Sequence, residues 1–243
     1  MNFKDCIDSY PFILMEGALG ERLKREFDLD ISGTVAMADL IYQQKGRMAL
    51  KTLWNEYMDI AHRYQLPFLA TTPTRRANKE RVYMAGYNES IITDNVDFLR
   101  TIKETANVNM YIGGLMGCKG DAYTSERALN QEEAIAFHSW QASLFKSVGV
   151  DFLYAGIMPV LSEAIGMAVA MSDTDIPYII SFTIQRNGKL IDGHTINDAI
   201  YYIDNHVSNK PVCYMTNCVH PDIVYEALSH KFNQTQMVKN RFW

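Results

Sequence analysis

The chain has 243 residues, of which 48% are hydrophobic and 21% charged, so it can bury a large core, and its length favours a single α/β domain over residues 1–243. The net charge of -5, with Lys and Arg scattered singly, argues against nucleic acid or anionic lipid as a partner. No apolar stretch approaches the ~18 residues of a membrane span, and the acidic N-terminus has no signal-peptide core. We therefore expect a cytoplasmic protein whose four cysteines are reduced.

Short apolar runs alternate with longer amphipathic stretches along the chain. The runs predict six strands, at residues 12–15, 67–70, 109–113, 151–155, 177–182 and 211–216. The stretches predict helices, among them residues 35–62, residues 131–147 after Asn130 as N-cap, and residues 222–230. Residues 238–243 are expected to begin a seventh strand. Regular βα alternation implies parallel strands, in either a (β/α) barrel or a doubly wound sheet.

Residues that are unusual in a buried strand, many of them small or hydroxylated, follow these runs, at the end of the sheet where α/β proteins place their chemistry. They include Glu16-Gly17 after the first run, Thr72 after the second, Gly113-Gly114 at the third and Asn217-Cys218 after the sixth. Together they suggest a backbone that approaches a small ligand. The alternative is that the glycines merely turn the chain.

Several strings in this order resemble the homocysteine S-methyltransferase family, in a divergent branch. The clearest are Met15-Glu-Gly-Ala-Leu-Gly20, Ser181-Phe-Thr183 with Leu190-Ile-Asp-Gly193, and Asn217-Cys-Val-His-Pro221. Three more strings agree with that branch: Thr72-Pro-Thr-Arg-Arg-Ala77, Gly120-Asp-Ala-Tyr123 and Ser162-Glu-Ala-Ile-Gly166.

The resemblance implies a (β/α)8 TIM-type barrel that transfers a methyl group from an S-methyl sulfonium donor to the thiol of homocysteine, forming methionine, with zinc as cofactor. It implies that Cys218 is a zinc ligand and that no catalytic residue is needed beyond the metal ligand. The substrate-binding residues that it implies are Glu16, Gly17, Thr72, Ser181 and Asn217.

The chain departs from the family pattern at two places. Gly156-Ile157 stands where the family has a Glu-Thr pair that holds the homocysteine amine, so a related small thiol is an alternative acceptor. The last two βα units, with a Cys-Cys pair that completes the zinc site, are absent from the sequence up to Trp243. We therefore expect weak or no zinc binding, little transfer to homocysteine, and exposed barrel edges that permit a homo-oligomer.

Two alternatives remain open at this point. Cys118 together with His194 or His220 could rebuild a metal site, whereas Cys213 is expected to face a helix. The chain could also be a catalytically silent homologue, or a truncated fragment, that binds a small amino acid or a partner chain.

Overall fold

The computed structural model describes residues 1–243, which form two compact units. Unit 1 comprises Met1–Leu115 and Leu144–Phe152, and unit 2 comprises Met116–Ser143 and Leu153–Trp243. The expectation of one domain over residues 1–243 stays a prediction.

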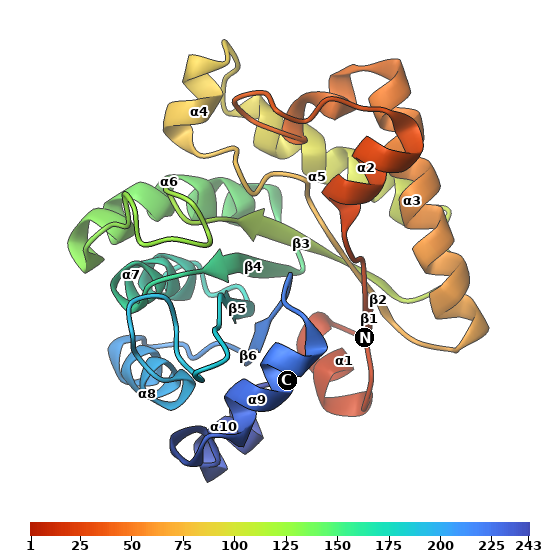
Figure 1. The fold of residues 1–243 in the computed structure, drawn as a ribbon. Helices are drawn as coiled ribbons and strands as arrows, with labels where there is room; N and C mark the ends of the chain where they lie inside the picture. The colour runs from red at the N-terminus through yellow and green to blue at the C-terminus, as the bar shows by residue number, and fades with distance from the viewer. The chain divides into compact units, whose positions relative to one another are not determined.

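Unit 1 contains the first part of the βα alternation (Figure 1). Its strands β1, β2 and β3 are parallel neighbours, with Leu14 of β1 opposite Phe68 of β2, and Phe68 opposite Met110 of β3. All four residues of β2 are buried, and three of the four are apolar, as expected for a strand covered on both faces. The elements in chain order are α1 (Phe3–Ser9), β1 (Leu14–Met15), α2 (Leu19–Phe27), the 3-10 helix η1 (Ala38–Tyr42), α3 (Gln44–Arg63), β2 (Phe68–Thr71), α4 (Lys79–Met84), α5 (Ser90–Lys103) and β3 (Met110–Met116).

The helix expected over residues 35–62 is interrupted. Gln43 has extended backbone angles, so the chain forms η1 and then α3 rather than one continuous helix. The two helices approach closely at Gly46, where an added Cβ would lie 2.4 Å from the carbonyl oxygen of Leu40. The prediction of a single helix was therefore wrong, because packing of η1 onto α3 requires a break that helical periodicity does not reveal.

The paired glycines of the third strand have a packing role. Strand β3 continues to Met116, so Gly113 and Gly114 lie inside it rather than after it. A Cβ at Gly113 would lie 2.4 Å from the ring of Phe152, and one at Gly114 would lie 2.6 Å from the ring of Phe145. These glycines admit two aromatic rings against the strand, which accounts for them without a ligand.

Unit 2 continues the alternation with three more parallel neighbours, β4, β5 and β6. Leu153 lies opposite Tyr178, and Ile179 lies opposite Cys213. Every residue of β4 and β5 is buried, and α7 packs against β5 and α8 (Figure 1). The elements are α6 (Gln131–Val148), which runs on into unit 1, β4 (Phe152–Met158), α7 (Leu161–Ser172), β5 (Tyr178–Phe182), α8 (Ile196–His206), β6 (Cys213–Thr216), α9 (Pro221–Ser229), the 3-10 helix η2 (Lys231–Asn233) and α10 (Gln236–Arg241).

Helix α6 begins where the sequence predicts. The side chain of Asn130 accepts a hydrogen bond from Glu133 N at 3.0 Å, and the Glu133 carboxylate accepts one from Asn130 N at 3.2 Å. This reciprocal pair is a capping box, so the expected N-cap at Asn130 is confirmed. Helix α9 also confirms its expected position, with Pro221 at its first residue.

The C-terminal residues differ from the prediction. Residues 238–243 were expected to begin a strand, but Gln236–Arg241 form α10, capped by the Thr235 side chain, which accepts a hydrogen bond from Val238 N. Only Phe242 pairs in the expected manner, in an isolated parallel bridge with Tyr214 of β6, and Trp243 N donates to Tyr214 O at 2.8 Å. The N-cap at Thr235 therefore starts a helix where a strand was expected.

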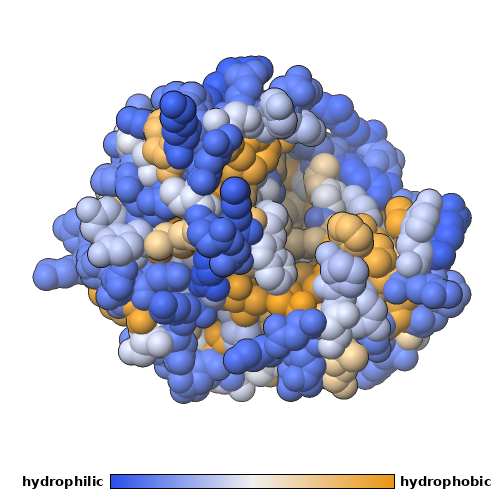
Figure 2. Space-filling view, turned by 90° about the horizontal axis from the view of Figure 1, so that it is seen from below, coloured by the Kyte–Doolittle hydropathy of each residue, from blue (hydrophilic) through white to orange (hydrophobic).

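The structure has the expected α/β class, that of a TIM-type barrel without its last two βα units. Its six strands alternate with helices in chain order, and within each unit every strand is parallel to its neighbour. None of the helices combines the length and hydropathy needed to cross a membrane. The face drawn in Figure 2 is mostly hydrophilic, with hydrophobic residues in patches between polar ones.

Candidate active site

Three of the predicted site residues meet in unit 2, at the carboxyl ends of β5 and β6. Ser181, near the end of β5, donates a hydrogen bond to Oδ1 of Asn217 at 2.6 Å. The hydroxyl of Tyr154, in β4, donates to the same oxygen at 2.9 Å. With Oδ1 occupied by two donors, the amide presents Nδ2 to the sulfur of Cys218 at 3.2 Å. The amide of Asn217 is thus fixed in one orientation toward the thiol.

Cys218 lies two residues beyond the end of β6, and its side chain is exposed. Its φ of 56° is in the left-handed region, which turns the chain sharply after Asn217. Cys213, at the start of β6, is buried, and burial raises the pKa of its thiol to about 12. The two cysteines therefore differ in accessibility: the sulfur of Cys218 can be reached from solvent, whereas that of Cys213 cannot.

Glu16 occupies a polar cluster in unit 1, directly after β1. Its Oε1 accepts hydrogen bonds from the Thr71 amide at 2.8 Å and from the Thr71 hydroxyl at 2.5 Å. Its Oε2 is buried and has no hydrogen-bond partner, although solvent reaches other parts of the residue. Burial raises the pKa of the Glu16 carboxyl from 4.5 to about 7, against the opposing effect of the Thr71 hydrogen bonds. Oε2 of Glu16 can therefore carry a proton or accept a hydrogen bond from a cationic group.

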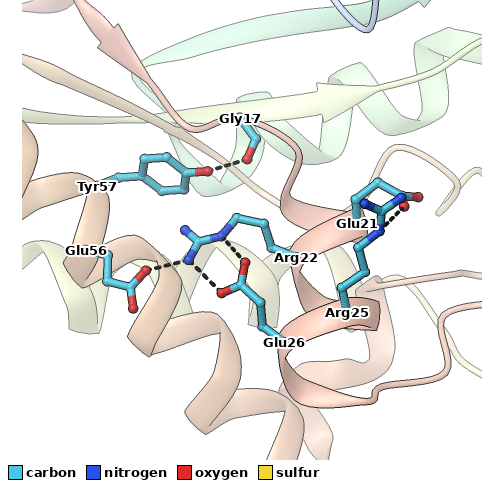
Figure 3. A network of polar contacts seen from close by, with 7 residues as sticks. All are labelled: Gly17, Glu21, Arg22, Arg25, Glu26, Glu56 and Tyr57. Carbon is cyan, nitrogen blue, oxygen red and sulfur yellow. Dashed lines mark hydrogen bonds and ion pairs between the residues drawn. The ribbon is translucent and has the colours of Figure 1, made fainter.

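Gly17 is held in place from α3 (Figure 3). The hydroxyl of Tyr57 donates a hydrogen bond to the carbonyl oxygen of Gly17. Arg22 on α2 lies over the Tyr57 ring, with Cζ 5.5 Å from its centroid. Two carboxylates bind the same guanidinium, Glu26 at 2.7 Å and Glu56 at 2.6 Å. This network ties the Glu16-Gly17 turn to α2 and α3.

Thr72 is fully buried, and its hydroxyl is used within the protein. Its Oγ1 accepts a hydrogen bond from Leu115 N at 3.1 Å and lies 2.7 Å from the hydroxyl of Thr74. Thr74 in turn donates to Leu115 O at 2.8 Å. These bonds join the end of β2 to β3, so the Thr72 side chain shapes the site through the backbone. Its neighbour Thr71 is the residue that contacts Glu16.

The residues of this chain do not fit a zinc site. A catalytic zinc takes three protein ligands, yet no three His, Cys, Asp or Glu side chains lie together so as to hold a metal ion. The proposed substitutes are engaged elsewhere: the Cys118 sulfur lies 3.7 Å from Gly120 O, His194 lies 3.1 Å from the Asp192 carboxylate, and His220 accepts a hydrogen bond from Asp222 N. The rebuilt site that the sequence left open is not formed.

The predicted site residues thus fall into two groups. Hydrogen bonds bring together Ser181, Asn217 and Cys218 in unit 2. In unit 1, Glu16 and Gly17 are neighbours in the chain after β1, and Thr72 follows β2, the strand that pairs with β1. The convergence of the two groups on one pocket stays a prediction.

Sequence reasoning missed Tyr154 and Tyr57 because the first lies inside an apolar strand and the second within a helix, where aromatic residues usually belong to the core. It also missed Thr71, the last residue of β2, although a hydroxyl at the carboxyl end of a strand was an available signal.

The family model and a curated relative point to one family. A family model described as homocysteine S-methyltransferase matches residues 13–240. The chain is 21% identical over 217 residues to homocysteine S-methyltransferase YbgG of Bacillus subtilis (strain 168), covering 82% of this chain and 67% of that protein.

Solved structures support the fold. The metallated form of the homocysteine methyltransferase MmuM from Escherichia coli has a TM-score of 0.75 at 19% identity, covering 91% of this chain and 80% of that one. The apo form of the same enzyme has a TM-score of 0.67 at 18% identity, covering 91% and 78%.

Proposed function

The chain belongs to the homocysteine S-methyltransferase family, and from this premise we propose that it transfers a methyl group from an S-methyl sulfonium donor to the thiol of homocysteine or a related small thiol. The observation that carries the proposal is the Asn217-Cys218 pair after β6, with an exposed sulfur and an amide fixed by Ser181 and Tyr154. We also propose a cytoplasmic location, in keeping with four cysteines that form no disulfide.

In this reaction the acceptor sulfur forms a bond to the methyl carbon while the bond from that carbon to the donor sulfur breaks. The donor loses its positive charge and leaves as a neutral thioether, and the acceptor thiol gives up its proton to water, so that one positive charge is conserved. Because a free thiol has a pKa near ~8.5, deprotonation and in-line positioning are what a protein contributes.

The amine of the acceptor needs an anionic partner, and Glu16 is the residue we assign to it. The unpartnered Oε2 can accept a hydrogen bond from an ammonium group, which would also favour the ionised carboxylate. At the end of β4, where the family resemblance implies Glu-Thr, the chain has Gly156 and Ile157, both buried. Glu16 would therefore be the principal anchor for the amine.

The metal-ligating side chains present in the chain favour a second candidate function. In this alternative, the protein binds a small amino acid without transferring a methyl group. The resemblance implies a zinc held by three cysteines, and Cys218 is the single one in a suitable position. We assign no step of the transfer to a zinc ion, because the residues described do not assemble its ligands.

Two measurements on the purified chain separate the two candidates: homocysteine binding by calorimetry, and methionine formation. The donors to test are S-methylmethionine and S-adenosylmethionine. Turnover that is lost in Cys218→Ser and retained in the control Cys6→Ala supports transfer. Binding without turnover supports the second candidate, and neither binding nor turnover refutes both.

A further inference from the structure

Glu163 is a buried carboxylate for which the proposed transfer has no use. It lies in the first turn of α7 with 0% of its surface exposed. Its Oε1 accepts a hydrogen bond from Lys119 N at 2.7 Å and lies 3.1 Å from Nε2 of His138 on α6, which is also buried. Its Oε2 accepts from Leu129 N at 3.4 Å. A carboxylate this deep is tolerated because its oxygens are paired.

The two backbone donors belong to one segment. Residues 117–130, here called the β3–α6 loop, connect β3 to α6, and Lys119 and Leu129 stand near its two ends. One carboxylate therefore closes the loop at both ends. Ser162, the neighbour of Glu163, adds a hydrogen bond from its hydroxyl to Leu129 O at 2.9 Å.

The middle of the β3–α6 loop is tied to the end of β5. The hydroxyl of Thr183 donates to Ala122 O at 2.6 Å. Thr183 lies two residues after Ser181, the residue that holds the amide of Asn217. Within unit 2 the loop thus lies at the same strand ends as the Asn217-Cys218 pair, the end at which parallel barrels build their active sites.

The contact between α6 and α7 fixes the position of Glu163. At Gly166, one turn further along α7, an added Cβ would lie 2.4 Å from Cβ of Ala134 and 2.6 Å from Gln131 O. Such close packing leaves α7 little freedom to shift against α6. The carboxylate therefore reaches His138 and both loop donors from a rigid base.

We propose that Glu163, with His138 as its partner, is a positioning residue that holds the β3–α6 loop as a fixed wall of the thiol-acceptor site beside Ser181 and Asn217. The proposal rests on the proposed function and names a further part of that site. Glu163 does not touch the acceptor; it acts through the loop. Four hydrogen bonds, three from α7 and one from Thr183 just after β5, hold three points of the loop backbone, at Lys119, Ala122 and Leu129.

Trypsin reports directly on whether the loop is closed. Arg127 is exposed within the loop, and cleavage after it requires the loop to leave its folded conformation. Glu163→Gln keeps the shape of the side chain but replaces one acceptor oxygen by a donor, so one backbone N–H loses its partner. We expect cleavage at Arg127 to become at least about tenfold faster. Glu132→Gln, the same change at an exposed position on α6, should leave the cleavage rate unchanged.

Steady-state kinetics give the second readout. Glu163→Gln should raise KM for homocysteine about tenfold while kcat changes less than about threefold, because the loop orders the acceptor site and does not take part in the transfer. Thr183→Val releases the middle of the loop and should shift both readouts in the same direction, which covers the case in which Glu163→Gln does not fold.

Unchanged cleavage in both variants would overturn the proposal, as would an opened loop with an unchanged KM. Absence of turnover in the unmodified chain would refute the proposed transfer instead, and the cleavage rates would still decide whether Glu163 holds the loop.

Discussion

Replacing Glu16 by Gln should change how the stability of the protein depends on pH. Burial raises the pKa of this carboxyl from 4.5 to about 7 in the folded state, and the Thr71 hydrogen bonds oppose the rise. Between these two values the folded protein holds a proton that the unfolded chain releases. Raising the pH through this window therefore destabilises the folded state, because the carboxylate must ionise with its Oε2 buried and unpaired.

The size of the effect follows from the two pKa values. Each pKa unit corresponds to about 1.4 kcal/mol, so ionising Glu16 in the folded protein costs at most about 3–4 kcal/mol above pH 7. This is an upper bound because solvent reaches part of the residue. The cost is absent below the unfolded pKa of 4.5. The glutamine side chain of the Glu16→Gln variant cannot ionise, so the variant should gain stability relative to the unmodified chain as the pH rises.

Urea denaturation of both proteins at several pH values between about 4.5 and about 8 measures this difference. Titration of all other groups cancels when the two unfolding free energies are subtracted at each pH. Glu132→Gln, an exposed control, should give a flat difference. A flat difference for Glu16→Gln as well would show that Glu16 titrates normally, and the reasoning from its buried oxygen would fail.

Three further perturbations test the packing and the site. Gly113→Ala should cost about 1–3 kcal/mol of unfolding free energy because its Cβ meets the Phe152 ring, whereas Gly33→Ala, with open space around it, should be near neutral; equal costs would contradict this. Tyr154→Phe and Ser181→Ala both remove a donor to Asn217, so their double-mutant cycle should show a coupling of about 0.5 kcal/mol or more, and strict additivity would refute the shared role. Alkylation at neutral pH, followed by mass spectrometry, should label Cys218 and leave Cys213 unmodified; comparable labelling of Cys213 would be inconsistent with its burial.

The strands could be predicted because parallel strands covered on both faces consist almost wholly of apolar residues. Each of the six runs contains or overlaps a strand of the structure, with boundaries that differ by a few residues. The errors occurred where a local pattern had two outcomes. Residues 35–62 have helical periodicity, but the extended backbone of Gln43 divides them, and residues 238–243 end in two aromatic residues that suit a strand, but the Thr235 cap starts a helix.

The candidate site was predictable in part. The order of the family strings placed Cys218 just after β6 and Ser181 in β5, and the structure joins them through Asn217. The loop held by Glu163 could not be predicted, since Lys119 and Leu129 contribute backbone N–H groups that no residue type marks. The partner of His138, a carboxylate 25 residues further along the chain, was not identified from the sequence.

The sequence by itself determined the class of fold, the family and the identity of the exposed thiol, because each depends on hydrophobic periodicity or on a string of neighbouring residues. The tertiary structure alone decided which hydroxyls fix Asn217, that Oε2 of Glu16 is buried without a partner, and that Glu163 faces His138. The physical reason is that burial and hydrogen bonding depend on residues far apart in the chain. Tyr154 and Asn217 are 63 residues apart, and Glu16 and Thr71 are 55 apart, so the environment of each polar group is set only when the strands pair.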